Sequence, residues 1–204
     1  MKKREIILAS SSPRRKELLK ELIKNFKVFP VDIPERVKKG ESAARYAKRL
    51  AVEKAEEAKG HLGGGALVIG ADTVVAIGKK ILGKPIDKND ARRMLKLLSG
   101  KTHTVTTAFC ILDAGSAEKI VRSVKTKVDF RRLKKGEIED YIKTDEPFDK
   151  AGAYAAQGGG SRFIKKIEGS YTNVVGLPVE ELKEALKAFG LNEIRQERQV
   201  NINR

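Results

Sequence analysis

The sequence is poor in the residues that disulfides and histidine metal centres require. It has one cysteine, Cys110, so no internal disulfide can form, and the chain suits a reducing cytoplasm. Cys110 lies in an apolar run typical of a strand, where we expect a small buried side chain and not a nucleophile. The two histidines, His61 and His103, are too few for a histidine-rich metal site.

Long apolar runs are also missing. No stretch approaches the roughly 18 consecutive apolar residues that a membrane-spanning helix needs. The apolar run within the first ten residues is short and leads into a charged segment, so we expect a first strand and not a signal peptide. With 40% hydrophobic and 34% charged residues, the composition is that of a globular chain with a sizeable core.

Positive charge, in contrast, is abundant. Lys and Arg number 43 against 27 acidic residues, which gives a formal net charge of +16. Such a field attracts polyanions, among them nucleic acids and free nucleotides. The alternative is a heavily charged, solvated surface of the kind found in heat-adapted proteins, and the small number of Asn and Gln residues agrees with it. Because there is no Trp and only 5% of residues are aromatic, few platforms remain for stacking nucleobases.

The apolar pattern predicts alternating strands and helices, which indicates an α/β (mixed α+β) architecture with a mixed sheet. The predicted strands cover about 4–9, 26–31, 66–77, 80–82, 103–113, 119–132 and 162–167. The predicted helices cover about 13–24, 42–59, 88–98, 135–143 and 178–189. We expect one domain over residues 1–190 and a polar C-terminal tail over 191–204.

The start of the first predicted helix is a candidate anion site. Ser12 suits the N-cap and Pro13 the first helical position, so Arg14 and Arg15 fall in the first turn. Cations are unfavourable there because the helix N-terminus already carries partial positive charge. A bound anion would remove the conflict, held by backbone N–H groups, serine hydroxyls and guanidinium groups. Alternatively, both arginines extend into water at a cost of up to about 1 kcal/mol.

Two charged residues interrupt apolar patterns. Lys54 lies in the apolar stripe of the helix predicted over 42–59, and it either extends to the surface or reaches into a cleft. Asp72 interrupts the strand predicted over 66–77. A buried carboxylate there needs hydrogen bonds, a cation or a metal, unless a turn or bulge exposes it. Lys84 lies in a tight turn. Cations and carboxylates without a strong nucleophile favour phosphate chemistry with a hard divalent metal.

Seven stretches, in order along nearly the whole chain to about residue 190, resemble the Maf family, also called septum formation inhibitor proteins. They are Leu8-Ala-Ser-Ser-Ser-Pro-Arg-Arg-Lys-Glu-Leu-Leu19, Leu50-Ala-Val-Glu-Lys-Ala55, Gly70-Ala-Asp-Thr-Val-Val75, Leu82-Gly-Lys-Pro85, Leu98-Ser-Gly-Lys-Thr-His-Thr-Val-Thr-Thr107, Asp149-Lys-Ala-Gly-Ala-Tyr154 with Gln157, and Glu168-Gly-Ser-Tyr-Thr-Asn-Val-Val-Gly-Leu-Pro178.

The resemblance implies a fold related to the inosine triphosphate pyrophosphatases, with two lobes around a long mixed sheet and a central cleft. It implies hydrolysis of a nucleoside triphosphate to the monophosphate and pyrophosphate with Mg²⁺ or Mn²⁺, and a homodimer. From the apolar runs and the aromatic content themselves we expect no membrane and no specific nucleic acid as partners. The implied site comprises catalytic Asp72, Lys54 and Lys84, substrate-binding Ser10, Arg14, Arg15, Thr73 and Gln157, and metal-binding Glu35 and Asp72, with Asp32 as a neighbouring alternative to Glu35.

The double arginine, Thr73 and Gln157 resemble the branch of the family that acts on dTTP and UTP, and not the branch that prefers 7-methyl-GTP. A glutamine amide both donates and accepts hydrogen bonds, so it can match the edge of a pyrimidine. One departure is Ala155-Ala156, where the family often has a glycine and an aliphatic residue. Two other functions stay open: a nucleotide-binding regulator of cell division, and a basic nucleic-acid-binding protein. Neither explains the charges at Lys54 and Asp72.

Overall fold

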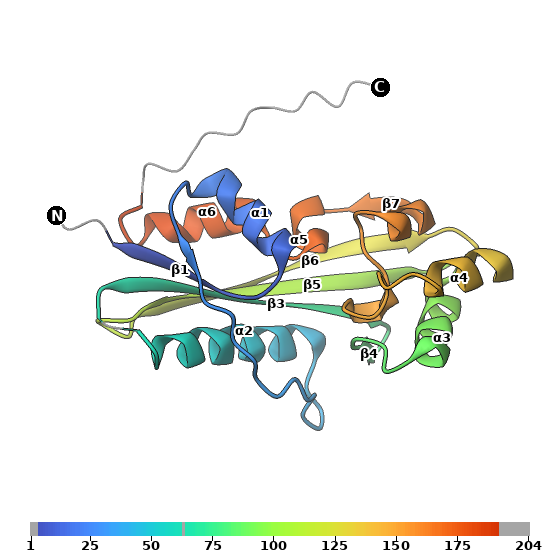
Figure 1. Ribbon diagram of the computed structural model, residues 1–204, viewed down its shortest axis with the longest axis horizontal. Helices are drawn as coiled ribbons and strands as arrows, with labels where there is room; N and C mark the ends of the chain where they lie inside the picture. Colours follow the sequence, from blue (N-terminus) through green and yellow to red (C-terminus); the bar gives the residue numbers. More distant parts are fainter. Residues whose placement is uncertain (1–3, 63, 192–204) are drawn as a thin grey trace, which may run out of the picture.

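The computed structural model describes residues 4–62 and 64–191, which form a mixed seven-stranded sheet with helices on both faces (Figure 1). β1 pairs in parallel with β2 and β3, and the other pairs are antiparallel, so the predicted mixed α/β class is confirmed. The sheet order is β2 (Lys27–Val28), β1 (Glu5–Ala9), β3 (Ala66–Ile77), β5 (Thr102–Asp113), β6 (Lys119–Phe130) and β7 (Ile164–Glu168), with β4 (Lys80–Leu82) paired to β3. The helices are α1 (Pro13–Leu22), α2 (Ala43–Lys59), α3 (Lys88–Leu98), α4 (Lys135–Ile142), α5 (Tyr171–Val175) and α6 (Val179–Lys187).

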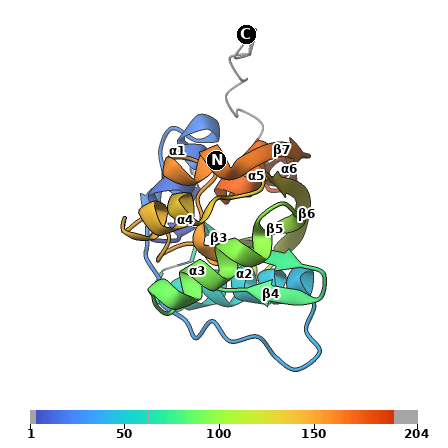
Figure 2. The same cartoon turned by 90° about the vertical axis from the view of Figure 1, so that its right-hand side faces the viewer.

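The helices form two layers. α2 covers one face of the sheet, α1, α5 and α6 cover the other, and α3 and α4 lie at one end (Figures 1 and 2). α2 packs through small side chains such as Ala51 and Ala55, both fully buried. A Cβ atom on Gly70 of β3 would lie 2.2 Å from the Ala51 carbonyl oxygen and 2.8 Å from the Ala55 nitrogen. Because only glycine allows this approach, α2 lies close against β3 beside Asp72.

One edge of β3 has a gap in its pairing. Residues 66–70 pair with β1 and residues 75–77 pair with β4, whereas the opposite edge pairs continuously with β5. In the described part of the chain no strand pairs with residues 71–74 at the first edge. The gap begins where β1 ends at Ala9, three residues before the N-cap of α1. Side chains from both faces of β3 therefore meet at this opening.

Three features differ from the sequence-based expectation. The strand expected over 26–31 is reduced to Lys27–Val28, since Phe29 still donates to the Leu8 carbonyl but Pro30 has no N–H to continue the ladder. The short helix α5 was not predicted, although Ser170 caps its start and Gly176 (φ 128°) its end. The strand expected over 162–167 begins only at Ile164, because the residues before it form a 3₁₀ helix, Gly159–Phe163.

Three other expectations concern the C-terminal tail, membrane-spanning helices and Cys110. The predicted tail lies outside the described residues from position 192 onward. Within the described ranges, no helix has the length and apolar character needed to cross a membrane. Cys110 is fully buried in β5, and burial raises the pKa of its thiol to about 11, in agreement with a structural role.

Candidate active site

A cavity of about 330 Å³ lies at the gap in the edge of β3. Its volume is in the range of small-molecule sites. The end of β1, the first turn of α1, the loop before α2, the β4–α3 loop and the segment around 149–156 all contribute to its wall. Eight of the predicted site residues line it: Ser10, Arg14, Arg15, Glu35, Lys54, Asp72, Thr73 and Lys84. The structure thus brings together residues that are up to 74 positions apart, from Ser10 to Lys84.

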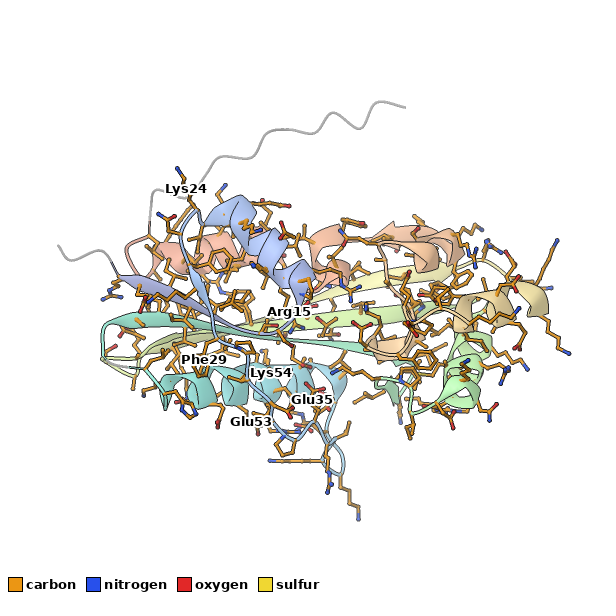
Figure 3. All side chains as sticks on the ribbon, in the orientation of Figure 1. Arg15, Lys24, Phe29, Glu35, Glu53 and Lys54 are labelled. Atoms are coloured by element: carbon orange, nitrogen blue, oxygen red, sulfur yellow. The ribbon has the colours of Figure 1, made fainter. Side chains whose placement is uncertain are left out.

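Lys54 joins two carboxylates at one wall of this cavity. Its Nζ donates to Glu35 Oε1 and to Asp72 Oδ1, both at 2.7 Å. Lys54 is 8% exposed and Asp72 5% exposed, so the lysine reaches into the cleft and does not extend to the surface. The bulge considered for Asp72 is absent, because the register between β3 and β5 runs unbroken through it. Figure 3 shows Glu35 and Lys54 side by side, on the α2 side of the sheet.

Lys84 extends this charged group. Its Nζ lies 3.5 Å from Glu35 Oε2, so the glutamate contacts two cations. Glu35 is the acidic residue of its loop that makes these contacts, whereas its neighbour Asp32 lines the cavity only. The order of charges is therefore Lys84, Glu35, Lys54 and Asp72, alternating in sign along the wall.

The two carboxyl groups have opposite pKa shifts. Burial raises the pKa of Asp72, and the charges of Lys54 and Arg15 offset this only in part. Burial also acts to raise the pKa of Glu35, but the hydrogen bond and charge of Lys54, with the charge of Lys84, outweigh it and lower that pKa. Asp72 is consequently the more basic of the two, which is the property of a proton acceptor.

The loop that carries Glu35 is held by a residue that the sequence pattern did not reveal. Arg49 of α2 donates to Glu41 through Nε at 2.8 Å and to the Arg36 carbonyl through Nη2 at 2.9 Å. The Arg49 hydrogen bond lowers the pKa of Glu41 to about 2, so the pair stays charged at neutral pH. Anchoring at 36 and 41 fixes the loop immediately after Glu35. An arginine on a helix surface carries no sequence signal of such a partner.

The first turn of α1 forms the opposite wall. Ser12 is the N-cap, as predicted, with its side chain accepting from the Arg15 N–H at 3.5 Å. Ser10, 6% exposed, accepts from the Ser12 N–H at 3.3 Å. Arg14 is half-buried and lines the cavity, and burial lowers its pKa, with Asp149 and Glu146 acting in the opposite direction.

Arg15 is bound to the protein and does not extend into water. Its Nε donates to the Gly176 carbonyl at 2.9 Å, Nη1 to the Ala71 carbonyl at 2.8 Å and to Ser10 Oγ at 3.3 Å, and Nη2 to Thr73 Oγ1 at 3.0 Å. Four of its five N–H groups are thereby used. The Ala71 carbonyl belongs to the unpaired edge of β3, so Arg15 takes the place of a neighbouring strand there. Figure 3 shows Arg15 at the start of α1, across the sheet from Lys54.

Gln157 is the one predicted substrate residue that does not line the cavity. It is exposed, and the residues before it, Ala155 and Ala156, form the wall instead. Glu146 holds the segment that follows, since its carboxylate accepts from the N–H groups of Gly159 and Gly160, both at 3.0 Å. Gln157 is thus placed at the margin of the cavity by an ordered loop.

The cavity wall also contains residues that the motifs did not single out as functional. Lys150 pairs with Asp149, and both line the cavity. Tyr154, also in the wall, contacts His103 Nε2 at 2.7 Å. Burial lowers the pKa of His103 to about 4, so this histidine is neutral at pH 7. The neutral ring of His103 therefore holds the Tyr154 hydroxyl in the cavity wall.

Two carboxylates of the cavity wall are the candidate ligands for a hard divalent cation. In the described part of the chain no group of three or more His, Cys, Asp or Glu side chains is assembled for a metal. Glu35 and Asp72 nevertheless place two carboxylates at one cavity wall. Mg²⁺ is often held by one or two carboxylates, with waters and substrate phosphates completing the shell. The donor set therefore fits a metal that binds together with a phosphate ligand.

Comparison with known proteins identifies the family. A family model described as Maf-like protein matches residues 5–189. The chain belongs to the Maf-like protein family. This Maf-like protein is 50% identical over 190 residues to the dTTP/UTP pyrophosphatase of Geobacter sp. (strain M21), which covers 93% of this chain and 98% of that relative. It is 48% identical over 189 residues to the dTTP/UTP pyrophosphatase of Pelotomaculum thermopropionicum, an alignment that covers 93% of this chain and 98% of that relative.

Among solved structures, the Maf-like protein aligns with the Staphylococcus aureus Ham1 protein at a TM-score of 0.49 and 15% identity, over 91% of this chain and 100% of that one.

Proposed function

We propose that this protein is a nucleoside triphosphate pyrophosphatase that hydrolyses dTTP and UTP to the monophosphate and pyrophosphate. The observation that carries the proposal is the cavity in which the start of α1 faces the charged group of Lys54, Glu35, Asp72 and Lys84. Cations and a helix N-terminus suit a triphosphate, and a buried carboxylate of raised pKa suits activation of water.

The preference for dTTP and UTP is supported by the relatives. Both relatives named above are called dTTP/UTP pyrophosphatases, and each aligns over 93% of this chain. The chain also has Thr73 in the cavity wall and Gln157 at its margin. We therefore expect the base to lie toward the segment 154–157 and the phosphates toward α1.

The reaction follows from these placements. At the start of α1, the Arg14 side chain and the remaining N–H of the Arg15 guanidinium bind phosphate oxygens. Asp72 orients a water molecule and accepts its proton as the water oxygen bonds to the α-phosphorus. The bond from the α-phosphorus to the bridging oxygen breaks, and pyrophosphate leaves with that oxygen. Lys54 and Lys84 stabilise the charge that develops on it, so positioning and electrostatics supply most of the acceleration.

A divalent metal is part of the proposal. Glu35 and Asp72 would hold Mg²⁺ or Mn²⁺, which would neutralise charge on the phosphate oxygens. Lys54 keeps both carboxylates in place through its two hydrogen bonds of 2.7 Å. A reducing cytoplasm as the location and a homodimer as the assembly stay predictions.

Incubation with a panel of canonical and modified triphosphates, with Mg²⁺ or Mn²⁺, tests this function. We expect monophosphate and pyrophosphate, formed fastest from dTTP and UTP. Diphosphate with orthophosphate would contradict the proposed position of cleavage, and fastest turnover of 7-methyl-GTP would contradict the base preference. Tight binding without any turnover would favour the regulatory function.

A further inference from the structure

A series of hydrogen bonds links Arg15 at the cavity to α5, whose C-terminal end, residues 174–176, also lines the cavity. It begins at Arg15 Nη2, passes to Thr73 Oγ1 at 3.0 Å, then to Thr107 Oγ1 at 3.0 Å, and ends at the backbone carbonyl of Asn173 at 2.7 Å. Thr73 and Thr107 lie directly opposite each other in the antiparallel pair of β3 and β5.

The direction of every bond in this series follows from counting protons. A guanidinium can only donate and a carbonyl can only accept. Thr107 has one hydroxyl proton, and the Asn173 carbonyl takes it, so Thr107 must accept from Thr73. Thr73 in turn accepts from Arg15 and has given its own proton to Thr107. The hydroxyl of Thr73 therefore has no proton left to donate to a substrate.

The end of the series is fixed by the geometry of α5. The N–H groups of Gly176 and Leu177 both donate to the Thr172 carbonyl, which leaves the Asn173 carbonyl for a partner outside the helix. The Asn173 side chain, fully buried, accepts from the Thr107 N–H at 3.1 Å and donates to the Val105 carbonyl at 3.2 Å. Thr107 is thus held by both the backbone and the side chain of Asn173.

α5 also holds the other end of the guanidinium. Arg15 Nε donates to the Gly176 carbonyl, the C-cap of α5. Gly176 has a φ of 128°, a conformation that favours glycine, and a Cβ there would be in van der Waals contact with Thr73 Oγ1 at 3.4 Å and with Arg15 Nε at 3.6 Å. Two carbonyls of one short helix therefore set the plane of the Arg15 side chain, one directly and one through two threonines.

We propose that Thr107 is a positioning residue for the phosphate site, and that Thr73 acts on the substrate through Arg15 and not by contact of its own hydroxyl. The inference rests on the proposed function and deepens it. Thr107 holds Thr73, Thr73 holds Arg15, and the orientation of Arg15 decides where its one remaining N–H meets a phosphate oxygen.

Substitution of Thr107 tests the role of this series of hydrogen bonds. Thr107→Val keeps the shape but removes the hydroxyl, and we expect the KM for dTTP or UTP to rise about tenfold with a smaller change in kcat, since a binding contact is misplaced. Thr107→Ser restores the hydroxyl and should return KM to within about threefold of the natural protein. The matched control is Thr106→Val, a neighbour in β5 that is 1% exposed and faces away from Thr73.

A double variant separates positioning from general loosening of the fold. Thr73→Val breaks the same series one link earlier, so Thr73→Val and Thr73→Val/Thr107→Val should have the same KM within about twofold. If the KM increases of the two single variants multiply in the double variant, the proposed series of hydrogen bonds is wrong. It is also wrong if Thr107→Val keeps the KM of the natural protein. If Thr107→Val does not fold, Thr73→Val carries the test alone, and a KM unchanged in that variant overturns the proposal.

A second readout needs no turnover. NMR of the natural protein should show separate, slowly exchanging Nη protons for Arg15, because four of its N–H groups are bonded. Thr107→Val should broaden or merge these signals, and Thr106→Val should not. Absence of turnover by the natural protein would contradict the proposed function alone, whereas unaltered Arg15 signals in Thr107→Val would contradict the positioning role alone.

Discussion

Lys54→Met removes the cation that joins Glu35 and Asp72 and keeps an apolar stem of similar length. The Lys54–Asp72 contact of 2.7 Å corresponds to an attraction of about 6 kcal/mol at an effective dielectric constant of about 20. Part of the lost attraction is offset because the variant no longer has the unfavourable desolvation of a buried ammonium group. Since breaking a buried pair costs about 3–5 kcal/mol and this cavity opens to solvent beside Glu35, we expect a loss of about 3 kcal/mol in the free energy of unfolding.

The loss should depend on pH. Burial already raises the pKa of Asp72, and removal of Lys54 raises it further. A carboxyl group whose pKa is higher in the folded than in the unfolded state destabilises the fold above its folded pKa, and the penalty fades as pH falls through that value. The pKa of Glu35 is lowered, so the contribution of Glu35 to the free energy of unfolding changes only at pH values below the ordinary pKa of a glutamate. Between pH 7.5 and pH 5 the deficit of the variant should therefore shrink through Asp72.

The assay is guanidinium chloride unfolding in EDTA at both pH values, with Lys48→Met, an exposed lysine of the same helix, as the control. A loss of about 3 kcal/mol corresponds to a fall of about 6–12 °C in Tm for a chain of this size. Equal stability of Lys54→Met and Lys48→Met, or a deficit independent of pH, would refute the coupling of Lys54 to a buried ionised Asp72.

Three further changes have defined outcomes. Asp72→Asn should lower kcat by about 10²–10⁴-fold with folding retained, because the proton acceptor is lost; near-normal turnover would remove Asp72 from that role. Gly70→Ala should cost about 3 kcal/mol or more, because its Cβ would lie 2.2 Å from the Ala51 carbonyl oxygen, and an unchanged Tm would show that α2 can move away. Gln157→Ala should lower kcat/KM for UTP about tenfold and affect inorganic triphosphate little, as measured by steady-state kinetics; equal losses for both would argue against base recognition.

Local sequence patterns predicted part of the charged group of the site, Lys54 and Asp72, whereas Glu35 and the turn residue Lys84 were assigned to it through the family resemblance. Lys54 and Asp72 are charges inside apolar stripes, and Ser12 with Pro13 marks a helix start, so each stands out without knowledge of the fold. The boundaries of β3, β4 and α3 were predicted as the structure has them, since turn residues bound each run.

The remaining parts depend on strand pairing, which local patterns do not encode. The gap at residues 71–74 exists because β1 ends and β4 begins at particular registers, and only then does Arg15 find the Ala71 carbonyl. Thr107 is an ordinary threonine in a β-strand until Thr73 lies opposite it. α5 is five residues long, too short for a periodic apolar pattern, although Ser170 and Gly176 can be recognised as its capping residues once the helix is known.

The central claim is that water attacks the α-phosphorus of a triphosphate in this cavity. Hydrolysis of dTTP or UTP in H₂¹⁸O, followed by mass spectrometry of both products, tests it most directly. Our account predicts one ¹⁸O atom in the nucleoside monophosphate and none in pyrophosphate, with the reaction lost in Asp72→Asn. Label in pyrophosphate or in orthophosphate would place the attack at the β- or γ-phosphorus and contradict the account.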